Sequence, residues 1–154
     1  FFLWDACLLG AKRKQNAIAG SATDIDLGII FDKKKHLNTL LSLNNEFKLK
    51  FHNNYSSLQL FHKMGVIDLL LFNKKNSKLE ITVDIPLGIV TNISKRSDFV
   101  KKKLVYKVSD FIPFKKCKIY SKNFFIPKNY LFLLKNKYGK HWKRPNKNAQ
   151  VYFG

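Results

Sequence analysis

The sequence predicts an α+β domain in which helices pack on a mixed β-sheet. Two apolar runs, 24–31 and 66–72, are rich in Ile, Leu and Val and are typical of buried strands. Between them, residues 33–45 place leucines at helical spacing. The chain has 154 residues, a length that fits one domain. Buried strands and amphipathic helices within one domain therefore indicate the α+β class.

Local signals set the bounds of the expected elements. Asp5 is placed to cap the first helix, Pro127 to open the last one and Gly139 to end it. Residues 88–109 show no readable period. In chain order we expect a strand at 1–4, a helix at 5–14, a loop at 15–23, a strand at 24–31, a helix at 33–45, strands at 47–52, 57–62, 66–72 and 79–83, a hairpin at 115–126 that turns near 122–123, and a helix at 127–137.

Charge is the most unusual feature of the composition. Lys and Arg number 29 against 10 Asp and Glu, which gives a formal net charge of +19. Such a balance favours an anionic partner, such as nucleic acid, a phosphorylated substrate or an acidic membrane face. Codon bias from an AT-rich genome explains the excess of Lys, Asn, Phe and Ile equally well, so charge alone identifies no partner.

Cysteine usage and hydropathy exclude several classes of protein. Cys7 and Cys117 are too few for a disulfide framework or a four-cysteine zinc site, and each is most simply a small buried hydrophobe. No stretch reaches the roughly 18 apolar residues that cross a bilayer. The first residues lack the basic segment and cleavage site of a signal peptide.

Two carboxylates open the first buried strand. Asp24 and Asp26 flank Ile25, and residues i and i+2 of a strand point to one face of the sheet. Two carboxylates on one face repel each other, and a divalent cation removes that conflict. Oxygen ligands at this spacing suit magnesium, which also binds substrate phosphates.

A third carboxylate interrupts the second buried run. Asp68 lies within 66–72, where an unpaired carboxylate costs several kcal/mol. Taken alone, Asp68 is explained as well by a salt bridge to a lysine, or by a hydrogen-bonded strand terminus, as by a metal. Together with the first two acids, a three-carboxylate metal site is the better explanation. Asp84 competes for the third position, but Pro86 marks a strand end there, where an aspartate is easily solvated.

The stretch 8–28 resembles the LicD and fukutin family. That family carries a Leu-Leu-Gly turn, an arginine three residues later, a loop and an Asp-Ile-Asp strand, and Gly10, Arg13, Asp24 and Asp26 fall on those positions. The C-terminal part is similar too, with Phe-Ile-Pro at 111–113 and a closing Tyr-Gly, Trp and Pro signature within 138–145. The same first stretch also fits the broader nucleotidyltransferase signature.

The resemblance implies a fold, a reaction and a set of ligands. We expect a single LicD-like domain over 1–154 with a nucleotidyltransferase-like mixed sheet, lacking the family's N-terminal helix. Relatives move phosphocholine or an alditol phosphate from a CDP-linked donor to a hydroxyl of a glycan, such as lipopolysaccharide, or of a glycolipid, and release CMP. Magnesium or manganese is the implied cofactor. The implied catalytic and metal-binding residues are Asp24, Asp26 and Asp68, and the donor phosphate-binding residues are Gly10, Lys12 and Arg13.

Departures from the family pattern leave the identity of the donor undetermined. Ala6-Cys7 replaces the usual Gly-Thr, and the loop 19–23 lacks the usual Pro-Trp and extra Asp. Both lie beside the expected donor site. Compartment is open as well, since bacterial relatives act at the cytoplasmic side or membrane periphery and animal relatives in the Golgi lumen.

Other readings compete with this one. An NTP-using nucleotidyltransferase shares the carboxylates, and a basic domain of this size binds nucleic acid through charge and aromatics. No specific nucleic-acid motif is present, so we expect no specific nucleic acid. Lysines 101–103 form a run that suits a solvated face or peripheral contact with an anionic membrane. We expect His62 and His141 to be surface residues, and Trp142 to be a packing residue. A degenerate, inactive copy is a further alternative.

Overall fold

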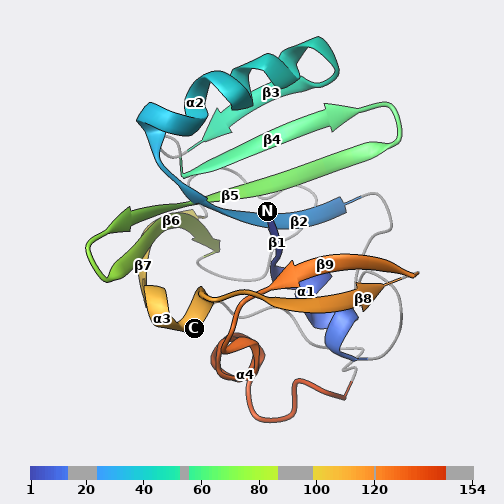
Figure 1. The fold of residues 1–154 in the computed structure, drawn as a ribbon, viewed down its shortest axis with the longest axis vertical. Coiled ribbons are helices and arrows are strands. Elements are labelled where there is room, and N and C mark those ends of the chain that lie inside the picture. Colours follow the sequence, from blue (N-terminus) through green and yellow to red (C-terminus); the bar gives the residue numbers. More distant parts are fainter. Residues whose placement is uncertain (14–23, 53–55, 87–98, 120, 145–154) are drawn as a thin grey trace.

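The computed structural model describes residues 1–13, 24–52, 56–86, 99–119 and 121–144. These residues form an α+β fold, as the sequence predicts (Figure 1). The helical elements are α1 (Asp5–Lys12), α2 (Lys33–Ser42), the short 3-10 helix η1 (Leu43–Asn45), α3 (Val108–Phe111) and α4 (Tyr130–Tyr138). The strands are β1 (Phe2–Leu3), β2 (Asp24–Phe31), β3 (Lys48–His52), β4 (Ser57–His62), β5 (Gly65–Lys75), β6 (Lys78–Pro86), β7 (Phe99–Lys107), β8 (Lys115–Ile119) and β9 (Lys122–Ile126).

The main sheet is mixed and has β5 at its centre. Its path runs β1-β2-β5-β4-β3, while β6 pairs with the far end of β5 and with β7. The β2–β5 pair is parallel, and the other pairs in this sheet are antiparallel. β8 and β9 form a separate hairpin. A central position explains why β5 is apolar on both faces, as expected for a strand covered from both sides.

Two apolar cores lie on opposite faces of the sheet. Leu69 and Leu71 point to the face covered by α2, where they pack with Leu40. Phe72 and its neighbours point to the other face, which α1, α4 and the hairpin cover (Figure 1). Alternate residues of β5 therefore serve different cores, and Asp68 belongs to the face that carries α1 and α4.

Gly28 lets β1 pack flat against β2. Phe2 is its partner in the strand register, and the Phe2 ring covers the glycine. A Cβ added at Gly28 would lie 2.3 Å from Phe2 Cε2, which no side chain tolerates. Phe2 in turn stacks on Phe114 and packs against Phe72. The absence of a side chain at position 28 thus makes room for the aromatic core.

Several helices and strands begin or end at other residues than the sequence predicts. β5 runs to Lys75 rather than ending at 72, because its end pairs with β6. β7 lies in the segment that showed no period; its burial does not alternate regularly, and pairing with β6 along its length defines it. α4 begins at Tyr130, so the prediction that Pro127 opens it was wrong, whereas Gly139 does end it with φ 77°.

Within the described residues, no helix has the length and apolar character needed to cross a bilayer.

Candidate functional site

Asp26 and Asp68 lie side by side on the two parallel strands. They are register partners in the β2–β5 pair. Neighbouring strands are about 4.8 Å apart, so two carboxylates that share a face and a register position lie within reach of one small cation. The fold therefore places Asp26 and Asp68, two of the three acids expected to form a metal site, next to each other on adjacent strands.

A cleft of about 350 Å³ contains both carboxylates. Asp84, which the sequence made a competitor for the third position, lines the same cleft from β6, where it is exposed. Asp5 reaches the cleft from the start of α1. Polar side chains from β3, β4 and β6 complete its wall: His52, Ser57, Gln59 and Thr82. Residues from both halves of the chain thus line one acidic cleft.

Asp26 also anchors α1. Its Oδ2 accepts a hydrogen bond from the Ala6 backbone N–H at 3.1 Å, and its own N–H donates to Cys7 Sγ at 3.2 Å. The Ala6 N–H is one of the unsatisfied donors of the first helical turn, and a carboxylate there is favoured by the helix dipole. The expectation that Asp5 caps this helix was wrong, because Trp4 is the N-cap residue and makes no side-chain cap.

Asp68 is held by a hydrogen-bonded chain across the sheet. Gln59 Nε2 donates to Asp68 Oδ1 at 2.8 Å, and Gln59 Oε1 lies 3.0 Å from His52 Nε2. Because the amide oxygen only accepts, His52 Nε2 is the donor in the second contact. Gln59 and His52 gave no signal in the sequence, since their relation to Asp68 depends on the β3–β4–β5 register.

Asp5 forms an ion pair with Lys137 of α4. The two side chains are only 16% and 17% exposed. Asp5 has φ 41°, in the left-handed region that a residue other than glycine adopts at an energetic cost. The pair connects the first helix to the last and sits at the edge of the acidic cleft.

The two paired carboxylates are the described residues that would hold a metal ion. Magnesium is usually held by one or two carboxylates together with water and substrate phosphates, and Asp26 and Asp68 supply two carboxylates on one face. Asp24 opens β2 opposite Val66, but its side chain lies outside the described residues. Among the side chains that are described, no group of three His, Cys, Asp or Glu is arranged to hold a metal.

The expected donor phosphate-binding residues have other contacts. Arg13 donates from Nε to the Trp142 carbonyl at 2.7 Å and from a terminal nitrogen to the Arg144 carbonyl at 3.3 Å. Lys12 Nζ lies 4.5 Å from the centre of the Tyr130 ring, and Gly10 is buried within α1. None of these three residues lines the acidic cleft.

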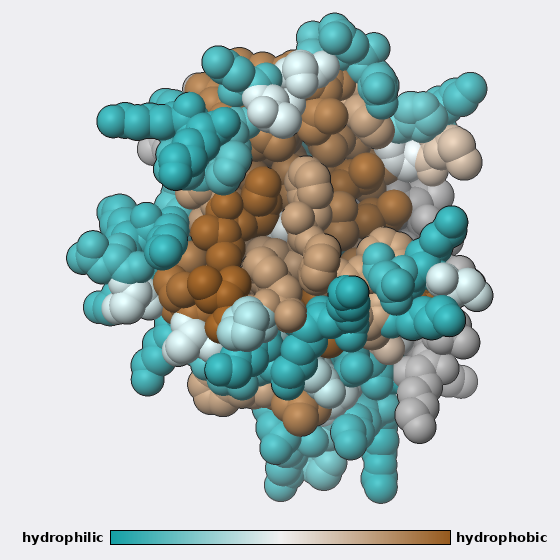
Figure 2. Space-filling model, viewed as in Figure 1, coloured by the Kyte–Doolittle hydropathy of each residue, from teal (hydrophilic) through white to brown (hydrophobic). Residues whose placement is uncertain are grey.

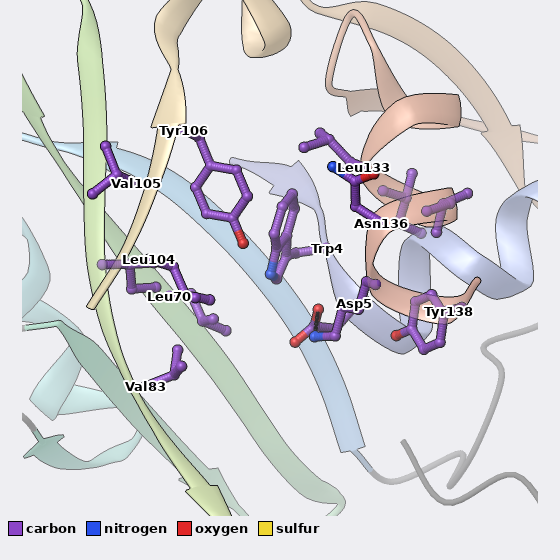
Figure 3. Close-up of a pocket in the computed structure, with 14 residues that line it drawn as sticks. Trp4, Asp5, Leu70, Val83, Leu104, Val105, Tyr106, Leu133, Asn136 and Tyr138 are labelled. Carbon is purple, nitrogen blue, oxygen red and sulfur yellow. Dashed lines mark hydrogen bonds and ion pairs between the residues drawn. The ribbon is translucent and has the colours of Figure 1, made fainter. Parts of the chain in front are cut away.

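A second hollow adjoins the cleft. Its walls include Trp4, Tyr106 and Tyr138, and Figure 3 shows the hydroxyls of both tyrosines directed toward the space beside the Asp5 carboxylate. Burial, together with the Asp5 carboxylate, raises the pKa of Tyr106 to about 12. Burial likewise raises the pKa of Tyr138, reinforced by the carboxylates of Asp5 and Asp26. Both phenols therefore stay protonated at neutral pH.

The remaining residues behave largely as the sequence predicts. His62 and His141 are exposed, Trp142 is buried in the core and Cys7 is buried. Cys117 is only half-buried, and neither cysteine is in a disulfide.

The lysine run 101–103 lies on β7 and is exposed. Lys103 pairs with Glu80 at 2.9 Å, and this contact, with one from Lys75, holds the pKa of the Glu80 carboxyl below its usual value. One member of the run thus neutralises a neighbouring acid within the sheet.

The fold and the cleft together define an α+β protein with an acidic cleft on one face of a mixed sheet. Searches of protein-family models and of curated proteins return no match to this chain.

Proposed function

We propose that this chain is a magnesium-dependent phosphotransferase of the LicD and fukutin type, with a nucleotidyltransferase-like fold. It moves phosphocholine or an alditol phosphate from a CDP-linked donor to a glycan or glycolipid hydroxyl and releases CMP. The observation that supports this most is the register pairing of Asp26 with Asp68 on adjacent parallel strands, inside one cleft. The Asp-x-Asp spacing at the start of β2 is consistent with it.

The side chains take distinct roles in this proposal. Asp26 and Asp68, with Asp24, hold magnesium or manganese, which supplies charge neutralisation at the donor phosphates. Asp68 accepts the proton of the acceptor hydroxyl. The hydroxyl oxygen attacks the phosphorus that bears the transferred group, the bond to CMP breaks, and CMP leaves with the bonding electrons. Gln59 positions Asp68 through its hydrogen bond.

The residues of α1 have other contacts that limit their proposed roles. Arg13 and Lys12 remain candidates for the donor phosphates, but Arg13 must release the Trp142 and Arg144 carbonyls to reach them. Gly10 allows close backbone approach. Peripheral contact with an anionic membrane through the exposed lysines 101 and 102 is compatible with a glycolipid acceptor.

An NTP-using nucleotidyltransferase is the second candidate, because the same paired carboxylates serve attack on an α-phosphate. One face of the molecule bears on the nucleic-acid alternative. On the face seen in Figure 2, the described residues at the middle are mostly hydrophobic and the hydrophilic ones lie around the rim. A continuous basic track, which a nucleic-acid groove needs, does not cross the middle of this face.

The test is CMP release from CDP-choline and from CDP-ribitol, with magnesium and with EDTA. We compare the unaltered chain with Asp26→Asn, which keeps an oxygen for the Ala6 N–H. Asp32→Asn is the matched control, because Asp32 caps α2 on the opposite face and asparagine caps equally well. Magnesium-dependent release that falls about 10²-fold or more in Asp26→Asn alone supports the proposal.

The other outcomes separate the alternatives. Pyrophosphate release from an NTP, without CMP release from either donor, would favour the second candidate. No magnesium-dependent reaction with any donor would overturn the phosphotransferase proposal.

A further inference from the structure

The hollow lies directly beside the acidic cleft. The two spaces share four lining residues: Asp5, Leu70, Ile81 and Val83. Tyr138 lines the hollow and is close enough to Asp26 for that carboxylate to raise its pKa. A ligand whose charged end lies at the cleft therefore has the hollow directly beside it.

The walls of the hollow suit a ring. Trp4 and Tyr106 stand nearly edge to face with ring centres 5.8 Å apart, and Leu104 and Leu133 add aliphatic surface (Figure 3). Aromatic and aliphatic walls with a few polar groups at their edge are typical of small-molecule sites. Such walls bury the faces of a ring and leave its polar edge to the hydroxyls.

The charges in the hollow cancel. Asp5 is the carboxylate there, and Lys137 pairs with it from α4. An aromatic cage binds a quaternary ammonium best when uncompensated negative charge faces it. With the Lys137 ammonium in place, a ligand cation meets an opposing cation, whereas an uncharged group meets two phenol hydroxyls and the Asn136 amide.

The space fits one ring. It measures about 230 Å³, below the roughly 300–1,000 Å³ of sites that enclose a drug-sized molecule. A single nucleobase or a single sugar ring is of suitable size, whereas a whole nucleotide is not. The phosphates of such a ligand then remain outside, at the carboxylates.

We propose that the hollow between α4 and strands β6 and β7 binds one uncharged, hydroxyl- or amide-bearing ring of the substrate, with Trp4, Tyr106 and Tyr138 as its walls. This inference rests on the proposed function for the identity of the ring, which is either the donor's cytosine or a sugar of the acceptor. It excludes the choline headgroup from this hollow.

Binding is measured without metal and without turnover. Trp4 is one of two tryptophans, so a Trp142→Phe background makes its fluorescence a reporter of the hollow. The probes are cytidine, methyl glycosides and choline, each added alone. Because Trp142 is itself buried, calorimetric titration of the unaltered chain with the same probes provides a second measurement.

The critical variant is one that fills the hollow with an added side chain. Leu104→Phe adds a ring to its wall, and Leu41→Phe is the matched control, since Leu41 is 47% exposed on α2. We expect binding of an uncharged ring that Leu104→Phe weakens about tenfold or more and Leu41→Phe leaves unchanged. Cytidine binding would assign the hollow to the donor, and glycoside binding to the acceptor.

Two results would overturn the inference. One is the absence of binding by every uncharged ring; the other is choline binding that Leu104→Phe weakens. Neither depends on CMP release, so this inference and the proposed function fail separately.

Discussion

Asp26 and Asp68 hold one register position on two parallel strands, and each carboxylate is already engaged by a neutral donor. The Ala6 N–H binds Asp26 and the Gln59 amide binds Asp68. Neutral donors fix the orientation of a carboxylate without cancelling its charge. At Asp68, where the sequence left a salt bridge to a lysine open, the partner within the described residues is the Gln59 amide.

Gln59 is expected to tune cation affinity. Gln59→Leu removes the donor that orients Asp68 and should weaken manganese binding about 10–100-fold, the usual effect of losing a group that supports a ligand. Paramagnetic resonance with manganese measures this without turnover. Asn73→Leu is the control, because Asn73 is a half-buried amide on β5, the strand that carries Asp68, and lies outside the cleft. Equal affinity in Gln59→Leu and the unaltered chain would show that Gln59 does not position a ligand.

Gly28 is expected to tolerate no side chain while Phe2 is present. Gly28→Ala places a Cβ within 2.3 Å of the Phe2 ring, so we expect a loss of about 1–3 kcal/mol in the free energy of unfolding. Urea denaturation measures it. Phe2→Leu combined with Gly28→Ala should lose less than the sum of the two single changes, because the shorter side chain relieves the clash. Strict additivity would contradict the packing described here.

Arg13 is expected to stabilise the C-terminal turn. Arg13→Gln removes the charged donor to the Trp142 and Arg144 carbonyls and should cost about 1–2 kcal/mol, discounted because one contact is exposed. Thermal unfolding without donor checks this. Lys128→Gln is the control, an exposed cation elsewhere. An unchanged melting temperature with a raised KM for the donor would instead identify Arg13 as a phosphate ligand alone.

Tyr106 should make the fold sensitive to alkali. Its pKa is about 12 in the fold against an ordinary value of 10.0, so the folded state keeps a proton that the unfolded chain loses first. The contribution of protonated Tyr106 to the free energy of unfolding is fully present below about pH 10. It is lost as the pH rises toward 12, which lowers the free energy of unfolding by about 2–3 kcal/mol. Urea midpoints between about pH 9 and pH 12 measure it. Tyr106→Phe should flatten this fall, whereas Tyr130→Phe should not; equal slopes would refute the assignment.

Local pattern determined much of the architecture. Residues 24–31 and 57–62 form strands with the expected bounds, and 66–72 lies within the central strand. Hydrophobic period is a local property, since it records which faces of a strand must be buried. The same local pattern singles out Asp26 and Asp68. A carboxylate inside an apolar run can be recognised without knowing which strands lie next to each other.

The tertiary structure decided which side chains meet. Asp5 reads locally as a helix cap, yet it pairs with Lys137, 132 residues away, and Asp26 serves α1 instead. Gln59 and His52 join the site only through the register of β3, β4 and β5. Register and helix docking follow from burying two apolar cores at once, a property of the whole chain that no short segment encodes.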